Sequence, residues 1–231
     1  MKSLIIRIKG ICRFHWAIII LAVFAAFIVA APTFFSMKAL GSAYHGVPFL
    51  FQDNEGFYMS RINEILDGHM GVGSPIIYEY KSTPTPLLPT GEYMYAIPTL
   101  LLGLQLTTTV VISKFAFPFF LFLLVYAISY FLLKDKQLTR PRLFAAVAAS
   151  LSILGFDLVD YKSLFSIFGG DVSELHLSIW SRLVNPITGG LLLFTYFLSL
   201  WGIIKNISRF WVISGVILGL MTGYVFSFAL A

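Results

Sequence analysis

Charged side chains are scarce in this chain. Only 12% of its 231 residues are Asp, Glu, Lys or Arg, whereas 58% are hydrophobic. A soluble domain of this size carries roughly 25% charge, so the composition excludes an ordinary soluble protein. Several apolar runs are long enough to cross a bilayer, and we predict an all-α integral membrane protein. In such a protein the net charge of +5 chiefly sets orientation, so it is no sign of a nucleic-acid partner.

Cysteine and the usual enzyme motifs are also missing. Cys12 is the one cysteine, which excludes an internal disulfide framework and a Cys-based metal site. The histidines stand far apart, without metal-ligand spacing, at His15, His45, His69 and His176. There is no Walker loop, no HExxH and no GxSxG. We therefore predict no metal centre built from cysteines or histidines and find no common soluble-enzyme motif.

Long apolar runs are what the sequence does contain. About five membrane-spanning helices are predicted, at residues 16–36, 110–133, 143–159, 187–204 and 210–231. The first follows a basic start, which is also typical of a cleaved signal peptide. We favour an uncleaved anchor, because the run is long and more spans follow. Nothing polar follows the last run, which predicts that residues 1–231 are a single transmembrane domain of a longer protein.

The segment 91–105 decides the topology. Its apolar part is too short to cross, and Pro98 interrupts it, so we expect a helix at or slightly inside the outer membrane surface. Ten of the sixteen Lys and Arg residues then fall on one side, at the N-terminus and in the turns 134–142 and 205–209. Because basic residues favour the cytoplasm, we predict a multi-pass protein of the cell membrane with a cytoplasmic N-terminus.

Two loops are then expected outside, at about 37–109 and 160–186. They and their flanks would hold ten of the eleven acidic residues. Residues 54–67 of the first loop have a helical rhythm, which predicts an amphipathic helix on the membrane surface. Its apolar stripe consists of Tyr58, Ile62, Ile65, Leu66 and His69. Asp53 at its start can act as an N-cap, and the helix N-terminus also favours its ionised form.

Proline-rich sequence follows this helix. Tyr78 and Tyr80 alternate there with Glu79 and Lys81. Tyrosines in such a loop can stack on the apolar face of a sugar, or simply anchor the chain at the membrane interface. In the second loop, Arg182 lies at the outer membrane boundary, where positive charge is unusual. It either snorkels to lipid headgroups or grips a lipid-linked phosphate.

The order of these features resembles the GT-C glycosyltransferases. Members of this family carry an acidic pair soon after the first span, which Asp53-Asn54-Glu55 matches here, with Tyr58 and Arg61 downstream. They also carry a Pro-Pro-Leu motif near the end of the loop, similar to Pro84-Thr85-Pro86-Leu87. The resemblance covers residues 16 to about 133.

The resemblance implies transfer of a sugar from a polyprenyl phosphate to a lipid, glycan or protein acceptor. It implies Asp53 as general base, with Glu55 as a second acid or orienting group. Arg61, Lys81 or Arg182 would contact phosphate. The other substrate-binding residues it implies are Tyr58, Tyr78, Glu79 and Asp171. Asp157, Asp160 or Asp171 could add to the site or hold a divalent cation, Mg or Mn, as in some members.

Three alternatives stay open. The chain could be part of a transporter or flippase, a polysaccharide polymerase or ligase, or an inactive fragment. Transporters place ionisable groups inside their spans. The expected spans here are almost free of them, with Lys114 as the exception, which favours chemistry at the surface.

Overall fold

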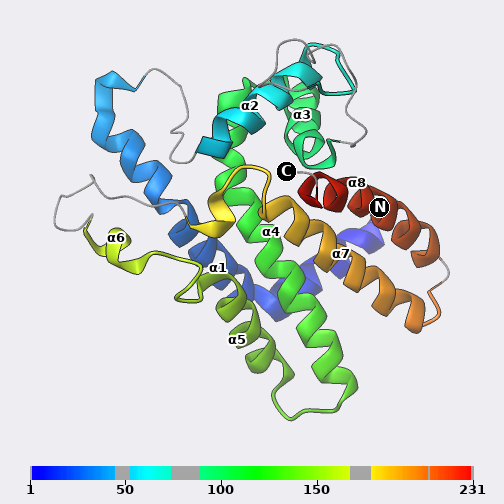
Figure 1. The fold of residues 1–231 in the computed structure, drawn as a ribbon. Helices are drawn as coiled ribbons and strands as arrows, with labels where there is room; N and C mark the ends of the chain where they lie inside the picture. Colours follow the sequence, from blue (N-terminus) through cyan, green and yellow to red (C-terminus); the bar gives the residue numbers. More distant parts are fainter. Residues whose placement is uncertain (1, 45–52, 74–88, 167–177, 208, 230–231) are drawn as a thin grey trace.

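All regular structure that the computed structural model describes is helical (Figure 1). The described residues are 2–44, 53–73, 89–166, 178–207 and 209–229; within them, only the backbone is described at 2–14, 53–54, 163 and 223–229. The helices, in chain order, are α1 (Lys2–Leu40), η1 (Gly41–Ala43), α2 (Asp53–Leu66), α3 (Thr90–Leu102), α4 (Leu106–Asp135), α5 (Pro141–Leu154), α6 (Tyr161–Ser166), η4 (Ile179–Ser181), α7 (Ile187–Ile204) and α8 (Phe210–Ala229).

Three helical stretches are long and apolar enough to cross a membrane. They are His15–Ala43, α4 and α7. Two shorter apolar helices accompany them among the described residues, α5 and the Phe210–Thr222 part of α8. The prediction of an all-α membrane protein is confirmed in this form, with three candidate spans among the described residues; the prediction of about five spans stays a prediction.

The predicted span over 143–159 is longer than the helix found there. Helix α5 ends at Leu154, because Gly155 leaves the helical region with ψ 149°. Its 14 residues rise about 21 Å, which is two thirds of a hydrocarbon core about 30 Å thick. Helix α5 alone is therefore shorter than that thickness, and any crossing there would include residues after Gly155.

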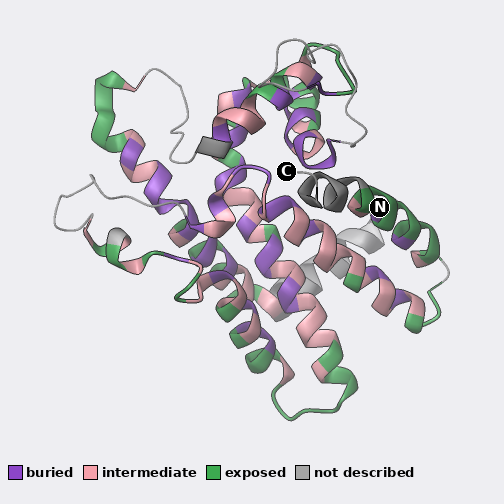
Figure 2. Ribbon diagram, in the orientation of Figure 1, coloured by how far each residue is buried: buried purple, intermediate pink, exposed green. Residues whose placement is uncertain are grey.

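Helix α4 lies at the centre and packs against α1, α5 and α7 (Figure 1). Small residues on α1 and α5 let the helices approach closely, as is common in membrane bundles. Figure 2 shows the buried residues along the facing sides of these helices. The core consists of Ala22, Ala25, Val29, Leu121, Phe122, Val125, Tyr126, Ala145, Ala149, Ile153, Ile187 and Leu191.

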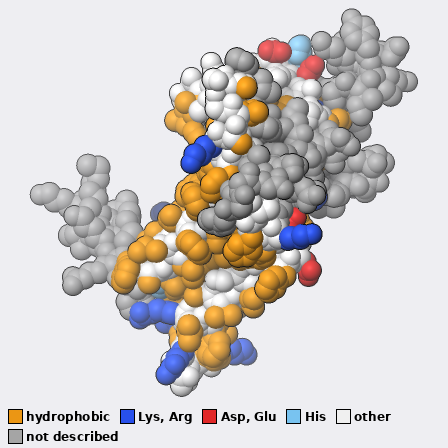
Figure 3. All heavy atoms as spheres, turned by 90° about the vertical axis from the view of Figure 1, so that its left-hand side faces the viewer, with side chains coloured by type: hydrophobic (Ala, Val, Ile, Leu, Met, Phe, Trp, Pro, Cys, Tyr) orange, Lys and Arg blue, Asp and Glu red, His pale blue; other side chains and the backbone are white. Residues whose placement is uncertain are grey.

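The outward sides of these helices are also apolar. Figure 3 shows a broad band of hydrophobic side chains, with Lys and Arg side chains gathered below it. Exposed large residues such as Phe24, Phe27, Leu151 and Trp211 belong to these outward sides. An apolar surface of this extent marks contact with lipid or other apolar partners, as expected of membrane helices.

The two basic turns lie at one end of the bundle. Lys205, in the turn after α7, forms an ion pair with Asp135 at the end of α4, with 2.8 Å between Nζ and Oδ2. Helix α1 kinks at His15, where the Tyr126 hydroxyl lies 2.6 Å from Nδ1 of His15. The contact fastens the kink to α4.

The opposite end of α4 carries α2 and α3 (Figure 1). The 30 residues of α4 rise about 45 Å, so about ten of them extend beyond a 30 Å core. We call α2, α3 and residues 106–114 of α4 the cap. Helix α3 has 13 residues, about 20 Å, and is too short to cross, as was predicted for 91–105.

Candidate functional site

Two buried ion pairs hold the cap together. Nε of Arg61 donates to Oε1 of Glu92 at 2.5 Å, and Nζ of Lys114 donates to Oε1 of Glu55 at 3.0 Å. The side chain of Lys114 is 2% exposed and that of Glu55 4%. One pair joins α2 to α3 and the other joins α2 to α4. The position of α2 is therefore set by charge as well as by apolar packing.

The apolar stripe predicted on α2 is largely confirmed, but it packs on protein. Ile62 and Ile65 are buried with Tyr95 of α3 and with Leu183 and Val184. Exposed His69 lies beyond the end of the helix. Its place in the predicted stripe is wrong, because Gly68, with φ 96°, turns the chain away.

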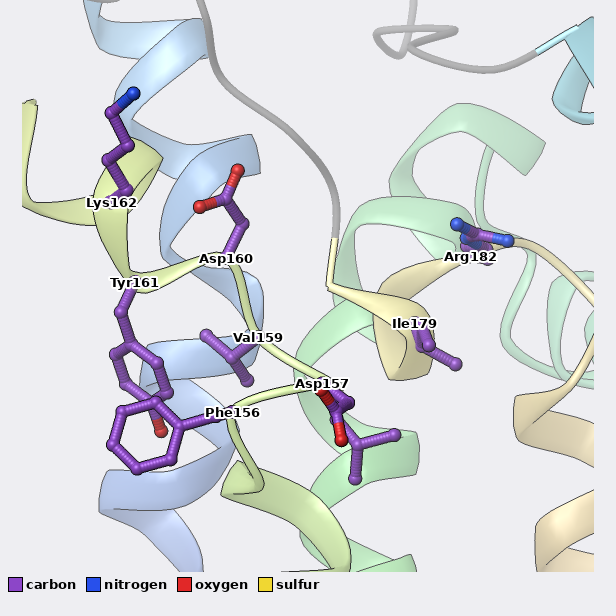
Figure 4. Close-up of a pocket in the computed structure, with 9 residues that line it drawn as sticks. Phe156, Asp157, Val159, Asp160, Tyr161, Lys162, Ile179 and Arg182 are labelled. Atoms are coloured by element: carbon purple, nitrogen blue, oxygen red, sulfur yellow. The ribbon is translucent and has the colours of Figure 1, made fainter.

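A cavity of about 460 Å³ opens where α5 ends (Figure 4). We call it the pocket. Asp157, Asp160 and Lys162 come from the segment after α5, while Arg182 follows η4. The pocket is lined by Phe156, Asp157, Leu158, Val159, Asp160, Tyr161, Lys162, Ile179 and Arg182.

Side chains satisfy the carbonyl groups that the early end of α5 leaves open. Trp180 donates from Nε1 to the Ser152 carbonyl at 2.9 Å, and the Tyr161 hydroxyl donates to the Leu154 carbonyl at 2.6 Å. Ser178 reaches the Leu158 carbonyl at 3.1 Å. Irregular backbone at membrane depth is tolerated where protein buries it or where it lines a cavity. Both conditions hold here.

The pocket lies far from the basic end of the bundle. Helix α5 begins beside Arg140 and Arg142, at that end, and rises about 21 Å before the pocket begins. Ionisable groups that line a cavity in so apolar a chain mark a candidate functional site.

Arg182 has a buried donor without a partner. Within the described part of the chain, no hydrogen bond reaches its buried Nε, and the residue lines the pocket (Figure 4). An unsatisfied buried donor costs about 1–3 kcal/mol, and more when it is charged. A guanidinium presents its donors as a fork that matches phosphate and carboxylate oxygens. The pocket is therefore suited to an anion.

The segment that carries Arg182 is attached to the cap. The backbone N–H of Val184 donates to the Tyr95 hydroxyl at 3.2 Å. The side chain of Asn185 shares a hydrogen bond with the Tyr58 hydroxyl, and burial raises the pKa of that phenol. The phenol therefore stays protonated at neutral pH. Cap and pocket thus meet in residues 183–185.

The predicted site residues divide into three groups. Glu55 and Arg61 are buried in ion pairs, which suits an orienting role for Glu55 and gives no support to a phosphate contact by Arg61. Arg182 lines the pocket, and Tyr58 shares a hydrogen bond with Asn185, three residues further along the chain. Asp53 begins α2, but its side chain lies outside the described structure, as do Tyr78, Glu79, Lys81 and Asp171. The roles of all these residues stay predictions.

Sequence reasoning missed the partners of the cap. Lys114 stood out as a charge in an apolar span, and such a residue needs a partner; that signal could have predicted a buried acid beside it, though not which one. Glu92 and Tyr95 share one side of α3 three residues apart, which is the helical spacing for a common face. Lys162, which also lines the pocket, was not among the predicted site residues.

The donor set of the pocket does not fit a protein-built metal site. Asp157 and Asp160 line it beside two cationic side chains. The described residues contain no group of three or more His, Cys, Asp and Glu side chains that could hold an ion. The predicted Mg or Mn ion stays a prediction, and no step below uses it.

Comparison of the chain with protein-family models, curated proteins and solved structures finds no match. The fold therefore defines the class, an all-α membrane protein, and the chemistry must be argued from the pocket.

Proposed function

We propose that the chain is a membrane glycosyltransferase that moves a sugar from a polyprenyl phosphate to an acceptor on the non-cytoplasmic face. The observation that carries the proposal is Arg182, whose buried Nε has no partner among the described residues and which lines a charged cavity. In the proposed topology this cavity lies at membrane depth. A polyprenyl phosphate offers such a cavity an anionic group, attached to a chain that stays in the lipid.

The proposed topology has five spans and a cytoplasmic N-terminus, with α5 and α8 as the two further spans. Its support is the basic end of the bundle, where the turns after α4 and α7 meet through Asp135 and Lys205. Positive charge at that end favours the cytoplasm, so the cap and the pocket would face outward. Cysteines placed at 53 and 171, labelled from one side only, test whether both loops share that side.

The pocket offers the groups that sugar transfer needs. Arg182 binds the phosphate through its fork of donors, and Lys162 adds a second cation on the other wall (Figure 4). The Tyr161 ring, which contacts the Phe156 ring at a centroid distance of 5.4 Å, provides an aromatic surface for the sugar. Fixed cations stabilise the departing phosphate, because charge develops on it as the bond breaks.

In the transfer step, the acceptor oxygen forms a bond to the anomeric carbon while the bond from that carbon to the phosphate oxygen breaks. The electron pair of the broken bond leaves with the polyprenyl phosphate. A carboxylate takes the acceptor proton as general base. Asp53 is the proposed base; Asp157 and Asp160 of the pocket wall help to balance the positive character at the anomeric carbon.

Binding of a polyprenyl phosphate to the purified chain in lipid nanodiscs tests the anion site. Arg182→Ala should weaken binding about 100-fold, and Arg182→Lys about tenfold, because an ammonium lacks the bidentate fork. Lys205→Met is the matched control, because it also removes one cation, at the basic end of the bundle. It should leave the affinity for the polyprenyl phosphate unchanged. Equal affinity for wild type and Arg182→Ala would remove the basis of the proposal.

Transfer itself is measured with a panel of isotopically labelled polyprenyl-phosphate sugars. Asp53→Asn should lower the rate about 100-fold or more, in line with the loss of a general base. A folded Asp53→Asn chain that transfers sugar at the wild-type rate would rule out Asp53 as base.

A flippase component is the second candidate. The same location of the pocket at membrane depth favours it, because a lipid phosphate can be held there without any bond being broken. Arg182-dependent binding with no transfer from any donor of the panel would favour this function over the transferase.

A further inference from the structure

A strained turn lies two residues after Arg182. Val184 has φ 62°, a left-handed conformation that a β-branched residue adopts only under constraint. Such conformations are strained and persist when the surroundings hold them. They cluster at functional sites. Contacts with the rest of the fold must therefore hold Val184 in this conformation.

The cap holds this turn. Tyr95, on α3, is 2% exposed, and its hydroxyl accepts the N–H of Val184 at 3.2 Å. The Tyr95 ring packs edge-on against Phe117 of α4 at a centroid distance of 5.0 Å. The ring is thus fixed between two helices, and its hydroxyl stands at a defined point above the turn.

The direction of Arg182 depends on the same turn. Leu183 and Val184 are buried against apolar residues of the cap, among them Ile62 and Tyr95, whereas Arg182 lines the pocket. Were Val184 to relax to a negative φ, the chain direction at Arg182 would change and the guanidinium would leave its place. Hydrogen-bonded support of this kind keeps a binding group within the narrow range that recognition needs.

We propose that Tyr95 is a positioning residue, which holds the strained Val184 turn through its hydroxyl and so keeps Arg182 aimed into the pocket. The proposal rests on the proposed function as far as the ligand is concerned, because it assigns Tyr95 a part in anion binding without contact to the anion. Its structural half, the coupling of Tyr95 to the position of residue 182, stands independently of the ligand.

Tyr95→Phe is the test variant, because it removes the hydroxyl and keeps the ring. In nanodiscs it should bind the polyprenyl phosphate about tenfold more weakly than wild type, which is the size expected for one lost hydrogen bond and a displaced guanidinium. Thermal unfolding of each variant shows that the chain is folded under the binding conditions.

A second substitution separates strain from packing. In the Tyr95→Phe background, Val184→Gly should restore affinity to within about threefold of wild type, because glycine adopts positive φ without strain. Val184→Ala is the matched control. It loses most of the same side chain but still resists positive φ, so it should restore nothing. Equal restoration by Gly and Ala would overturn the proposal.

A measurement without ligand separates the role proposed for Tyr95 from the proposed function of the chain. With Cys12→Ser and Arg182→Cys as background, the alkylation rate of the cysteine at 182 reports the direction of that residue. Tyr95→Phe should change this rate at least threefold, and Val184→Gly should bring it back. If wild type binds no polyprenyl phosphate, the proposed function fails while this arm still decides the role of Tyr95. An unchanged alkylation rate in the Tyr95→Phe chain would overturn that role.

Discussion

The cap and the pocket hold the same kinds of charged side chain and use them in opposite ways. In the cap, Glu55 pairs with Lys114 and Arg61 with Glu92, and all four are buried. In the pocket, the side chains of similar charge line a cavity, and Arg182 keeps a buried Nε without a partner. A buried charge that is paired with an opposite charge fixes the position of the helix that carries it. A charged side chain that lines a cavity can instead bind a ligand.

The comparison also explains why the cap needs two pairs. A buried ion pair adds little net stability, because desolvation offsets most of the attraction between the charges. Its value lies in excluding other arrangements, since any shift of α2 would leave a charge buried alone. The two pairs, one to α3 and one to α4, thus fix the position of α2 relative to both helices. The turn that carries Arg182 is built on this support.

The largest expected effect comes from breaking the cap pair at Lys114. Lys114→Met leaves the Glu55 carboxylate buried without its partner, and we expect a loss of about 3–5 kcal/mol in the free energy of unfolding. Unfolding of the full chain by SDS titration in mixed micelles measures it. The same substitution in the pocket, Arg182→Met, should not lower the free energy of unfolding, since the buried Nε has no hydrogen bond to lose among the described residues.

A double variant completes this comparison. Glu55→Gln combined with Lys114→Met removes both charges and should recover most of the loss, because no charge is then left unpaired. A double variant as unstable as Lys114→Met alone would show that packing of the lysine stem, rather than its charge, supports the cap.

A smaller effect is expected at the pocket wall. Tyr161→Phe removes the 2.6 Å bond from the hydroxyl to the Leu154 carbonyl and should cost about 1 kcal/mol. Burial raises the pKa of this phenol above its usual 10.0, so the protonated form is favoured in the folded state. Its contribution is present below about pH 10 and is lost as the pH rises through the raised pKa. The Tyr161→Phe chain should lack this loss of stability when the pH is raised above about 10.

The sequence predicted the parts of this fold that depend on local signals. The span 187–204 coincides with α7, and 54–67 lies within a residue of α2, because apolar runs and helical periodicity are properties of neighbouring residues. The end of α5 was placed too late, since Leu158 and Val159 continue the apolar run after Gly155. Glycine followed by Asp157 was the signal that could have corrected it.

The sites depend on contacts between residues far apart in the chain, and these were out of reach. Glu55 and Lys114 are 59 positions apart, and Val184 and Tyr95 are 89 apart. No local sequence pattern predicts which buried acid a lysine will pair with. Arg182 could be singled out from its place at a membrane boundary, but its unpaired Nε and the strained turn beside it follow only from the packing of α3 on the segment before α7.

The smallest effect is expected where an ion pair is exposed. Lys205 and Asp135 lie 2.8 Å apart, slightly closer than Lys114 and Glu55, but their side chains are 41% and 40% exposed. Water and salt screen such a pair, so Lys205→Met should leave the unfolding midpoint within error of wild type in the same SDS titration, with and without added salt. Because the two pairs have similar distances, the contrast between Lys205→Met and Lys114→Met isolates burial as the cause. A Lys205→Met chain as unstable as Lys114→Met would show that contact distance, and not burial, decides what a charge contributes to this fold.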